Sequence, residues 1–528
     1  MTTAAAQGAA PHGATTKAGA GAVGVTGTGA GSPAPTGPVE NKLQRKYGLL
    51  MAMCMVVGTV IGSGIFFRNE QIITIAGGRM WIGVAAWVIG GLITLASAYV
   101  ISVLAARHER VGGLVDYSEA MVGQGYGYVF GWFMATIFYP SMTGILAWVT
   151  ARFTVELLDW DTRFGVDSTY SAETYALALF YLVMIFTLNG LSPRLSEKLQ
   201  VSGTFIKVVP LILMGVVGLI VGLVNGVTLD NLQFIAHPET TGLGNRIVGG
   251  DASSSAFFYA LTATVFAYVG WDCVTNLNSE IRNSKRNLPI ALCLGMVIIM
   301  AIYALYFVGV FSAAPVDVIV APGGTRDAFT TLFSPVAGTV LFVFIVISCI
   351  GTLNGLTVAT QRSLYAVAVR GTGPRPDVLS EVDERTNVPH NATTLSMLFV
   401  AAWMVVNALD LNPNFPGFTF NVTNLIPVAF AALFIPVFIG VMVKERTLGT
   451  FNRYVAPAFA ILGVLFLMFT VVYNERWATA WFLLVFAVIT GVGWLLRGGS
   501  DRQGGERAIT PSSTTSPDDG ALPEPSAN

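Results

Sequence analysis

The fold of this chain is decided by the stretch from Leu49 to Phe67, which reads LLMAMCMVVGTVIGSGIFF. The stretch is apolar and about long enough to cross a bilayer, yet three small residues, Gly62, Ser63 and Gly64, interrupt its middle. Consecutive small residues weaken a helix, and lipid offers no partners to the backbone groups that are released. Such a break is tolerated where bare backbone lines a polar cavity, so we expect a broken membrane helix beside a binding site.

Composition excludes an ordinary soluble protein. The chain has 528 residues, of which 53% are hydrophobic and 11% are charged, whereas soluble proteins average about 25% charged residues. The net charge is −1, and no basic cluster points to nucleic acid. With only 4 His residues, neither a metal centre nor a catalytic centre is expected, so we predict no cofactor, no bound metal and no enzymatic activity.

Apolar stretches predict an all-α integral membrane protein with twelve spans and polar tails. Residues 1–41 and 498–528 are expected to be disordered tails, and residues 42–497 to form one transport domain. The predicted spans lie near residues 49–67, 80–105, 126–157, 173–191, 203–225, 253–275, 288–313, 334–366, 393–410, 420–443, 454–473 and 477–496.

Charge predicts how these spans are oriented. Most of the 29 Lys and Arg residues fall in alternate loops, such as the loop that carries Arg282, Lys285 and Arg286. Loops rich in Lys and Arg stay on the cytoplasmic side. Both termini are therefore predicted to be cytoplasmic, which requires an even number of spans.

A second interruption, Gly270-Trp271-Asp272, lies in the sixth predicted span. It is five spans from the first, and an odd offset gives the two halves opposite topology. This is the pattern of an inverted repeat with its binding site at the midplane. We predict repeats over about residues 49–225 and 253–443.

The two breaks predict a site for a zwitterion, with the carboxylate on N–H groups and the ammonium on carbonyls. The candidate carboxylate donors are the N–H groups of Ser63, Gly64 and Ile65. The candidate ammonium acceptors are the carbonyl groups of Thr59, Val60, Ile61, Phe266, Ala267 and Tyr268. The alternative for the first break is a helix-packing face of small residues.

Two charged residues fall inside predicted spans, where charge is costly and usually functional. Asp272 is a candidate proton relay or hydrogen-bonding post, or else it lies near the inner interface and fixes the break at Gly270. Lys207 is a candidate fixed cation that replaces a sodium ion, or a proton carrier. Its alternative is to extend its ammonium toward water near Glu197 and Lys198.

Three uncharged residues complete the candidate site. Phe266 is a candidate wall of the side-chain pocket, with ordinary core packing as the alternative. Tyr139, before Pro140, places an aromatic ring at a kink and is a pocket candidate. Asn354, before Gly355, either faces the cavity or satisfies a helix contact.

These motifs resemble the amino acid–polyamine–organocation superfamily over about residues 42–497. The first-helix signature is matched by GTVIGSGIF at residues 58–66, and the sixth helix and its loop by FAYVGWD at 266–272 and NSKRNLP at 283–289. The sequence LNG at residues 353–355, continuing to Gly373-Pro374, is similar to L-type amino acid transporters and related bacterial exchangers.

The resemblance implies a leucine-transporter-type fold with a five-plus-five inverted repeat and two further C-terminal helices. It implies that the N–H groups from Ser63 to Ile65 hold a substrate carboxylate, that Phe266 closes over the substrate, and that Lys207 replaces sodium. An acid after the glycine–aromatic pair occurs in several branches, matching Asp272. Mammalian light chains carry an outer-loop cysteine, whereas Cys54, Cys273, Cys293 and Cys349 all lie in or beside spans, so no disulfide-linked heavy chain is expected.

We therefore expect sodium-independent amino acid transport across a bacterial cell membrane by alternating access, as a proton symporter or an exchanger. The alternatives are an amine or polyamine exporter or antiporter, and an amino acid sensor that does not transport. The side chain recognised and the oligomeric state stay open.

Overall fold

The structure, a computed structural model, describes residues 45–108, 113–233, 255–319, 328, 330–412 and 420–497. The predicted tails at residues 1–41 and 498–528 lie outside the described residues. Within these ranges the regular structure is helical, and extended pairing is limited to one isolated bridge between Tyr47 and Ile281. The all-α prediction is confirmed.

Twelve described segments are long and apolar enough to cross a membrane, which confirms the predicted number of spans. They are Leu49–Phe66, Met80–Arg107, Gln124–Leu157, Ala172–Leu191, Pro193–Val224, Ala256–Glu280, Ser284–Ala313, Thr339–Ala368, His390–Leu411, Val422–Lys444, Phe451–Asn474 and Arg476–Leu495.

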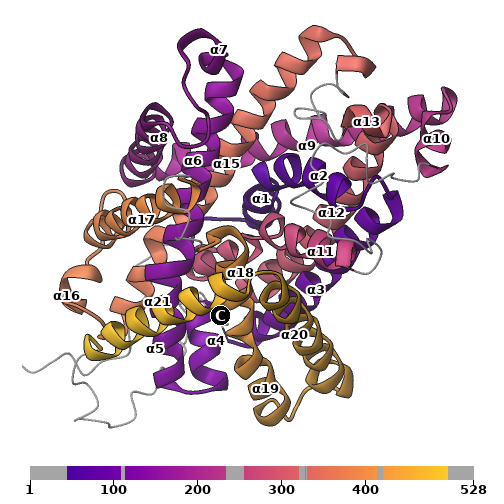
Figure 1. Ribbon diagram of the computed structural model, residues 1–528. Coiled ribbons are helices and arrows are strands. Elements are labelled where there is room, and N and C mark those ends of the chain that lie inside the picture. Colours follow the sequence, from indigo (N-terminus) through magenta and orange to yellow (C-terminus); the bar gives the residue numbers. More distant parts are fainter. Residues whose placement is uncertain are drawn as a thin grey trace, which may run out of the picture. The chain divides into compact units, whose positions relative to one another are not determined.

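Several spans consist of more than one helical element (Figure 1). The elements of the first half are α1 (Leu49–Val60), α2 (Ser63–Ile75), α3 (Met80–Arg107), α4 (Leu114–Met121), α5 (Gln124–Phe133), the π-helix η1 (Met134–Phe138), α6 (Tyr139–Leu157), α7 (Trp160–Phe164), α8 (Ala172–Leu191), α9 (Pro193–Val224) and α10 (Val227–Gln233).

The elements that follow are α11 (Ser255–Ala267), the 3₁₀-helix η2 (Trp271–Glu280), α12 (Ser284–Ala313), α13 (Val316–Ile319), α15 (Pro335–Ala368), α16 (Pro376–Leu379), α17 (His390–Leu411), α18 (Val422–Ala432), α19 (Phe434–Lys444), the π-helix η3 (Phe451–Val455), α20 (Ala456–Asn474) and α21 (Arg476–Leu495).

One boundary differs clearly from the sequence prediction. Helix α9 begins at Pro193, ten residues before the predicted start of the fifth span at residue 203. Proline favours the first turn of a helix, where its missing N–H has no acceptor anyway. The polar turn after Pro193 continues the helix beyond the apolar segment, so hydropathy does not detect it.

The broken helices lie in the interior of the bundle. Helix α1 packs against α9, α12, α15 and η2, and α2 packs against α11. Burial separates inner spans from outer ones: in an apolar window of 18 residues, 94% of the residues are buried in the span Gln124–Leu157 and 17% in the span Arg476–Leu495.

Candidate functional site: two facing helix breaks

The first helix breaks where the small residues predict it. Helix α1 ends at Val60 and α2 begins at Ser63, while Gly62 between them is non-helical with φ −140° and ψ −141°. The first N–H groups of any α-helix lack acceptors within that helix. The N–H groups of Ser63, Gly64 and Ile65 occupy this position in α2, and the positive end of the helix dipole adds to their pull on an anion.

The sixth span breaks at Gly270. Helix α11 ends at Ala267, and Gly270 has φ +106°, a left-handed conformation that glycine adopts without strain. The chain then continues as the 3₁₀-helix η2, which contains Asp272. The last carbonyls of α11 therefore leave the regular hydrogen-bond pattern of the α-helix at this break.

The two breaks touch each other. A Cβ at Gly64 would lie 2.7 Å from Cα of Ala267, and a Cβ at Gly270 would lie 2.8 Å from Cγ2 of Thr59. Tyr303 of α12 joins them, because its Oη lies 2.9 Å from the Val60 carbonyl oxygen and 3.0 Å from that of Ala267. The Tyr303 hydroxyl donates only one hydrogen bond at a time, and each carbonyl oxygen has two lone pairs. Both carbonyl oxygens therefore keep at least one lone pair for a ligand. Sequence reasoning missed Tyr303.

A small cavity, here called the break cavity, lies between the two breaks. It is lined by Thr59, Val60, Gly62, Gly64, Leu146, Phe266, Val269, Thr352 and Leu356. Among the described residues, none hydrogen-bonds to the buried Oγ1 of Thr59, so this hydroxyl is available to a ligand. The structure thus brings Thr59, Val60, Gly64 and Phe266 together at one cavity. It adds Leu146, Val269, Thr352 and Leu356, which sequence reasoning missed.

Lys207 is buried, with 1% of its surface exposed, and points at the first break. Its ammonium donates to the carbonyl of Gly58 and lies 3.3 Å from Oγ1 of Thr352. Thr352 Oγ1 lies 3.1 Å from the Ile61 carbonyl oxygen. One ammonium therefore connects α9 with the end of α1 and with α15, and the alternative of extending toward water does not hold.

Asp272 and Tyr139 form a buried pair beside the break. Tyr139 Oη donates to Asp272 Oδ2 over 2.5 Å, and Asn276 Nδ2 donates to the same hydroxyl over 2.6 Å. Tyr139 and Asp272 are both fully buried. Neither Tyr139 nor Asp272 lines the break cavity.

Asn354 lies in a helix contact. Its Oδ1 accepts from Asn189 Nδ2 over 2.9 Å and from Ser196 Oγ over 3.0 Å, and its Nδ2 donates to Gln200 Oε1 over 3.1 Å. These partners belong to α8 and α9. The geometry favours the helix-contact alternative for Asn354 over the proposed place at the cavity.

Arg68, in the middle of α2, contacts Phe266, which lines the break cavity. Its guanidinium carbon lies 5.5 Å from the ring centroid of Phe266, within the range of a cation–π contact. The same guanidinium donates to Gln71 over 2.6 Å and to Asn424 over 3.3 Å. Arg68 thereby ties α2, α11 and α18 together on one side of the candidate site.

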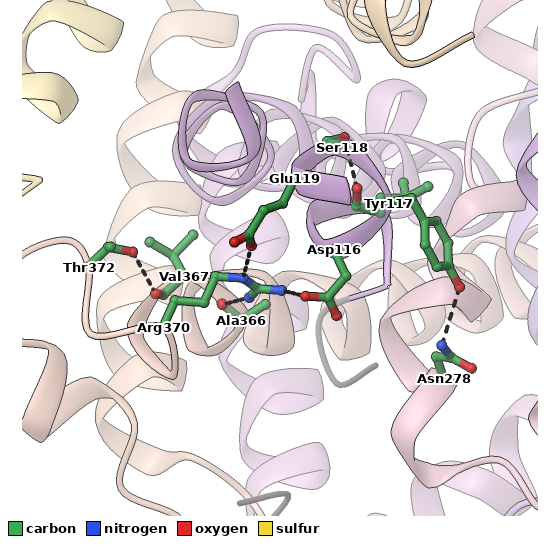
Figure 2. A network of polar contacts seen from close by, with 10 residues as sticks. Asp116, Tyr117, Ser118, Glu119, Asn278, Ala366, Val367, Arg370 and Thr372 are labelled. Atoms are coloured by element: carbon green, nitrogen blue, oxygen red, sulfur yellow. Dashed lines mark hydrogen bonds and ion pairs between the residues drawn. The ribbon is translucent and has the colours of Figure 1, made fainter. Parts of the chain in front are cut away.

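Ion pairs close the opposite side, which carries the loops rich in Lys and Arg. Figure 2 shows Arg370, just after α15, between Asp116 and Glu119 of α4. Its Nε lies 3.4 Å from Glu119 Oε2. Tyr117 of α4 accepts from Asn278 of η2 over 3.2 Å. Helix α4 therefore joins the end of α15 to the broken sixth span.

A second set of charges lies near the start of α1. The Arg362 guanidinium and the buried Glu280 carboxylate are 2.6 Å apart, and Lys46 lies 3.4 Å from the same carboxylate. Burial lowers the pKa of Lys46, while the negative charge of Glu280 opposes that shift. These contacts hold the start of α1 against η2 and α15.

Twelve candidate spans, with two facing helix breaks around an interior cavity, define a multi-pass membrane protein of the transporter class. The family model described as "Amino acid permease" matches residues 47–496. The chain belongs to this family, which confirms the resemblance found in the motifs.

Curated relatives agree with this family. The Serine/threonine exchanger SteT of Bacillus subtilis is 27% identical over 428 residues, covering 81% of this chain and 89% of the relative. The human Cystine/glutamate transporter is 23% identical over 389 residues, covering 74% and 73%. The human b(0,+)-type amino acid transporter 1 is 25% identical over 388 residues, covering 72% and 74%.

Proposed function

We propose that this protein exchanges amino acids across a bacterial cell membrane by alternating access, without sodium. Membership of the amino acid permease family supports the solute class, and the exchange for which the Bacillus relative is named supports exchange. We infer that sodium is not needed from the hydrogen bond that the Lys207 ammonium donates to the Gly58 carbonyl near the first break.

In this proposal the substrate backbone binds between the two breaks. Its carboxylate accepts from the N–H groups that open α2, where the helix dipole favours negative charge. Its ammonium donates to carbonyls at the ends of α1 and α11, which Tyr303 leaves with a free lone pair each. The free hydroxyl of Thr59 offers a further contact.

Lys207 supplies an amino group of the chain itself where a transported ion would otherwise bridge two helices. The ammonium is covalently part of α9, so no sodium concentration is needed to keep α1, α9 and α15 together. Without a co-transported ion, net movement follows the gradients of the amino acids on the two sides. This is why exchange is the form of transport that we propose.

Proton-coupled uptake is a second candidate, favoured by the buried Asp272–Tyr139 pair. A carboxyl group at membrane depth is a recognised carrier of protons. In that case Asp272 would bind and release one proton per cycle beside the moving break at Gly270.

The arrangement in the membrane is also part of the proposal. We place both termini in the cytoplasm, because loops rich in Lys and Arg remain on that side. The domain limits of 42–497 and the repeats over about 49–225 and 253–443 belong to the same proposal.

Two sets of sodium-free proteoliposomes test the function. One set is empty inside and has an inward proton gradient, and the other has no gradient but holds unlabelled amino acids. Exchange predicts uptake of a labelled amino acid mixture only into the preloaded vesicles. Uptake only with the gradient would establish proton symport instead, and uptake in neither set would contradict transport and favour a sensor.

A further inference from the structure

A second cavity, here called the aromatic cavity, lies beside the break cavity. It is lined by Gly90, Ile93, Thr94, Ser97, Phe138, Thr264, Val265, Tyr268, Val269, Trp271, Asp272, Pro427, Phe430, Ala431, Phe434, Val464 and Leu467. Val269 also lines the break cavity, so the two spaces are neighbours on either side of one side chain. The backbone site described above does not use this second space.

Asp272 provides a carboxylate oxygen there that is not engaged. Its Oδ2 accepts from Tyr139, whereas Oδ1 is buried and has no hydrogen-bond partner of acceptable geometry among the described residues. None of the ion pairs found in the described ranges involves Asp272. A buried polar oxygen without a hydrogen-bond partner is costly, and a cationic donor from a ligand would satisfy it.

The hydroxyl groups of the aromatic cavity can act only as acceptors toward a ligand. Thr94 donates its proton to the Gly90 carbonyl over 2.9 Å, Ser97 to that of Ile93 over 3.3 Å, and Thr264 to that of Leu261 over 2.7 Å. Tyr268 likewise donates to a backbone carbonyl, that of Trp87, over 2.7 Å. With their protons committed, these oxygens offer lone pairs, which suit an ammonium or guanidinium with several donors.

Aromatic rings form much of the remaining wall. The rings belong to Phe138, Tyr268, Trp271, Phe430 and Phe434. Aromatic faces attract cations, and more strongly when the cation is desolvated. No Lys, Arg or His is among the lining residues, so nothing there repels a positive charge.

We infer that the aromatic cavity receives the cationic end of a substrate side chain, and that Asp272 selects amino acids such as lysine, ornithine or arginine. This inference rests on the proposed function. The substrate backbone stays between the breaks, and its side chain passes Val269 to bring an ammonium or guanidinium to Asp272 Oδ1. The cation then pairs with a carboxyl group for which the described residues supply no counter-ion.

Lysine and norleucine form the decisive pair of probes, because they differ only in the terminal ammonium. We would measure how each unlabelled compound inhibits counterflow of a labelled neutral amino acid into preloaded proteoliposomes. Wild-type protein should prefer lysine over norleucine by about tenfold or more, as expected for a charge-assisted hydrogen bond. Asp272→Asn, with nearly the same shape, should lose that preference.

Glu156→Gln is the matched control, since Glu156 pairs with Arg152 four residues away on α6 and accepts a hydrogen bond from Ser168 over 3.4 Å, away from both cavities. It should keep the wild-type preference. Thermal stabilisation of purified protein by lysine and by norleucine gives a second readout if Asp272→Asn transports poorly. Counterflow without a lysine preference, or a preference that survives in Asp272→Asn, overturns the inference and leaves transport standing. No counterflow of any amino acid overturns the proposed function and the inference together.

Discussion

At the scale of single residues, the Lys207 ammonium is the interaction on which the sodium-independent account depends. It is buried and donates to the carbonyl of Gly58, close to the point where α1 loses its regular hydrogen bonds. A buried ammonium is tolerated only where its donors are satisfied by such acceptors. Its removal should leave the Gly58 carbonyl and the Thr352 hydroxyl without this donor.

Lys207→Ala should keep the fold but reduce exchange at least tenfold, because the connection between α9 and the broken helix is lost. The measurement is initial counterflow, normalised to the amount of protein in the vesicles. Lys198→Ala removes an exposed lysine of the same helix and should have no comparable effect. Normal counterflow by Lys207→Ala would remove the role assigned to this residue.

Gly64→Leu should abolish substrate binding, since even a Cβ at this position would lie 2.7 Å from Cα of Ala267. The added side chain would separate the two breaks and cover the N–H groups that open α2. Binding is measured by isothermal titration with purified, monodisperse protein. Gly48→Ala is the control, because a Cβ there meets nothing within 4 Å. Wild-type affinity in Gly64→Leu would argue against a carboxylate site at this break.

At the scale of elements, α4 connects parts that must separate if the site opens toward the side rich in Lys and Arg. It is held to the end of α15 by Arg370 and to η2 through Tyr117 and Asn278. Asp116 is nearly buried, with 4% of its side chain exposed, and Arg370 has 17% exposed. Breaking a largely buried pair from one side leaves an uncompensated charge.

Arg370→Gln alone should therefore lower the apparent melting temperature more than the double variant Asp116→Asn/Arg370→Gln. The coupling energy of that pair should be about 1–3 kcal/mol, between values for exposed and buried pairs. Arg152→Gln, which breaks a half-exposed pair four residues apart, is the control and should cost about 0.5 kcal/mol or less. Additive effects of Asp116→Asn and Arg370→Gln would contradict the ion-pair account of α4.

The sequence predicted the structural features that depend on a few adjacent residues. Gly62 to Gly64 and Gly270 marked both breaks, because small residues weaken a helix wherever it lies. The early start of α9 at Pro193 was missed, since its first turn is polar and hydropathy measures only the apolar part.

The candidate site could be predicted only where it consists of backbone. Tyr303, which joins the two breaks, is 243 positions from Val60, and its hydroxyl has no pattern that sets it apart from a core tyrosine. Thr352 and Arg68 were missed for the same reason. A polar residue inside a span can also hydrogen-bond to a neighbouring helix instead of lining a cavity. Asn354 is an example, because it hydrogen-bonds to residues of α8 and α9.

At the scale of the whole molecule, the fold places the proposed backbone site inside an apolar bundle, with side-chain contacts on two sides of it. Arg68 covers Phe266 on one side, and the ion pairs of α4 lie on the other. Contacts that close both ends of a central cavity are what alternating access requires, since each end must open while the other stays shut.

The central claim is that the facing breaks bind the backbone of an amino acid, and competition by modified substrates tests it most directly. Counterflow of the best-transported labelled amino acid would be measured against the same amino acid unlabelled, its decarboxylated amine and its N-acetyl derivative. The account predicts that only the intact zwitterion competes, because the N–H groups of α2 need the carboxylate and the free carbonyls need the ammonium. Equal competition by the amine would contradict the carboxylate site and favour an amine transporter.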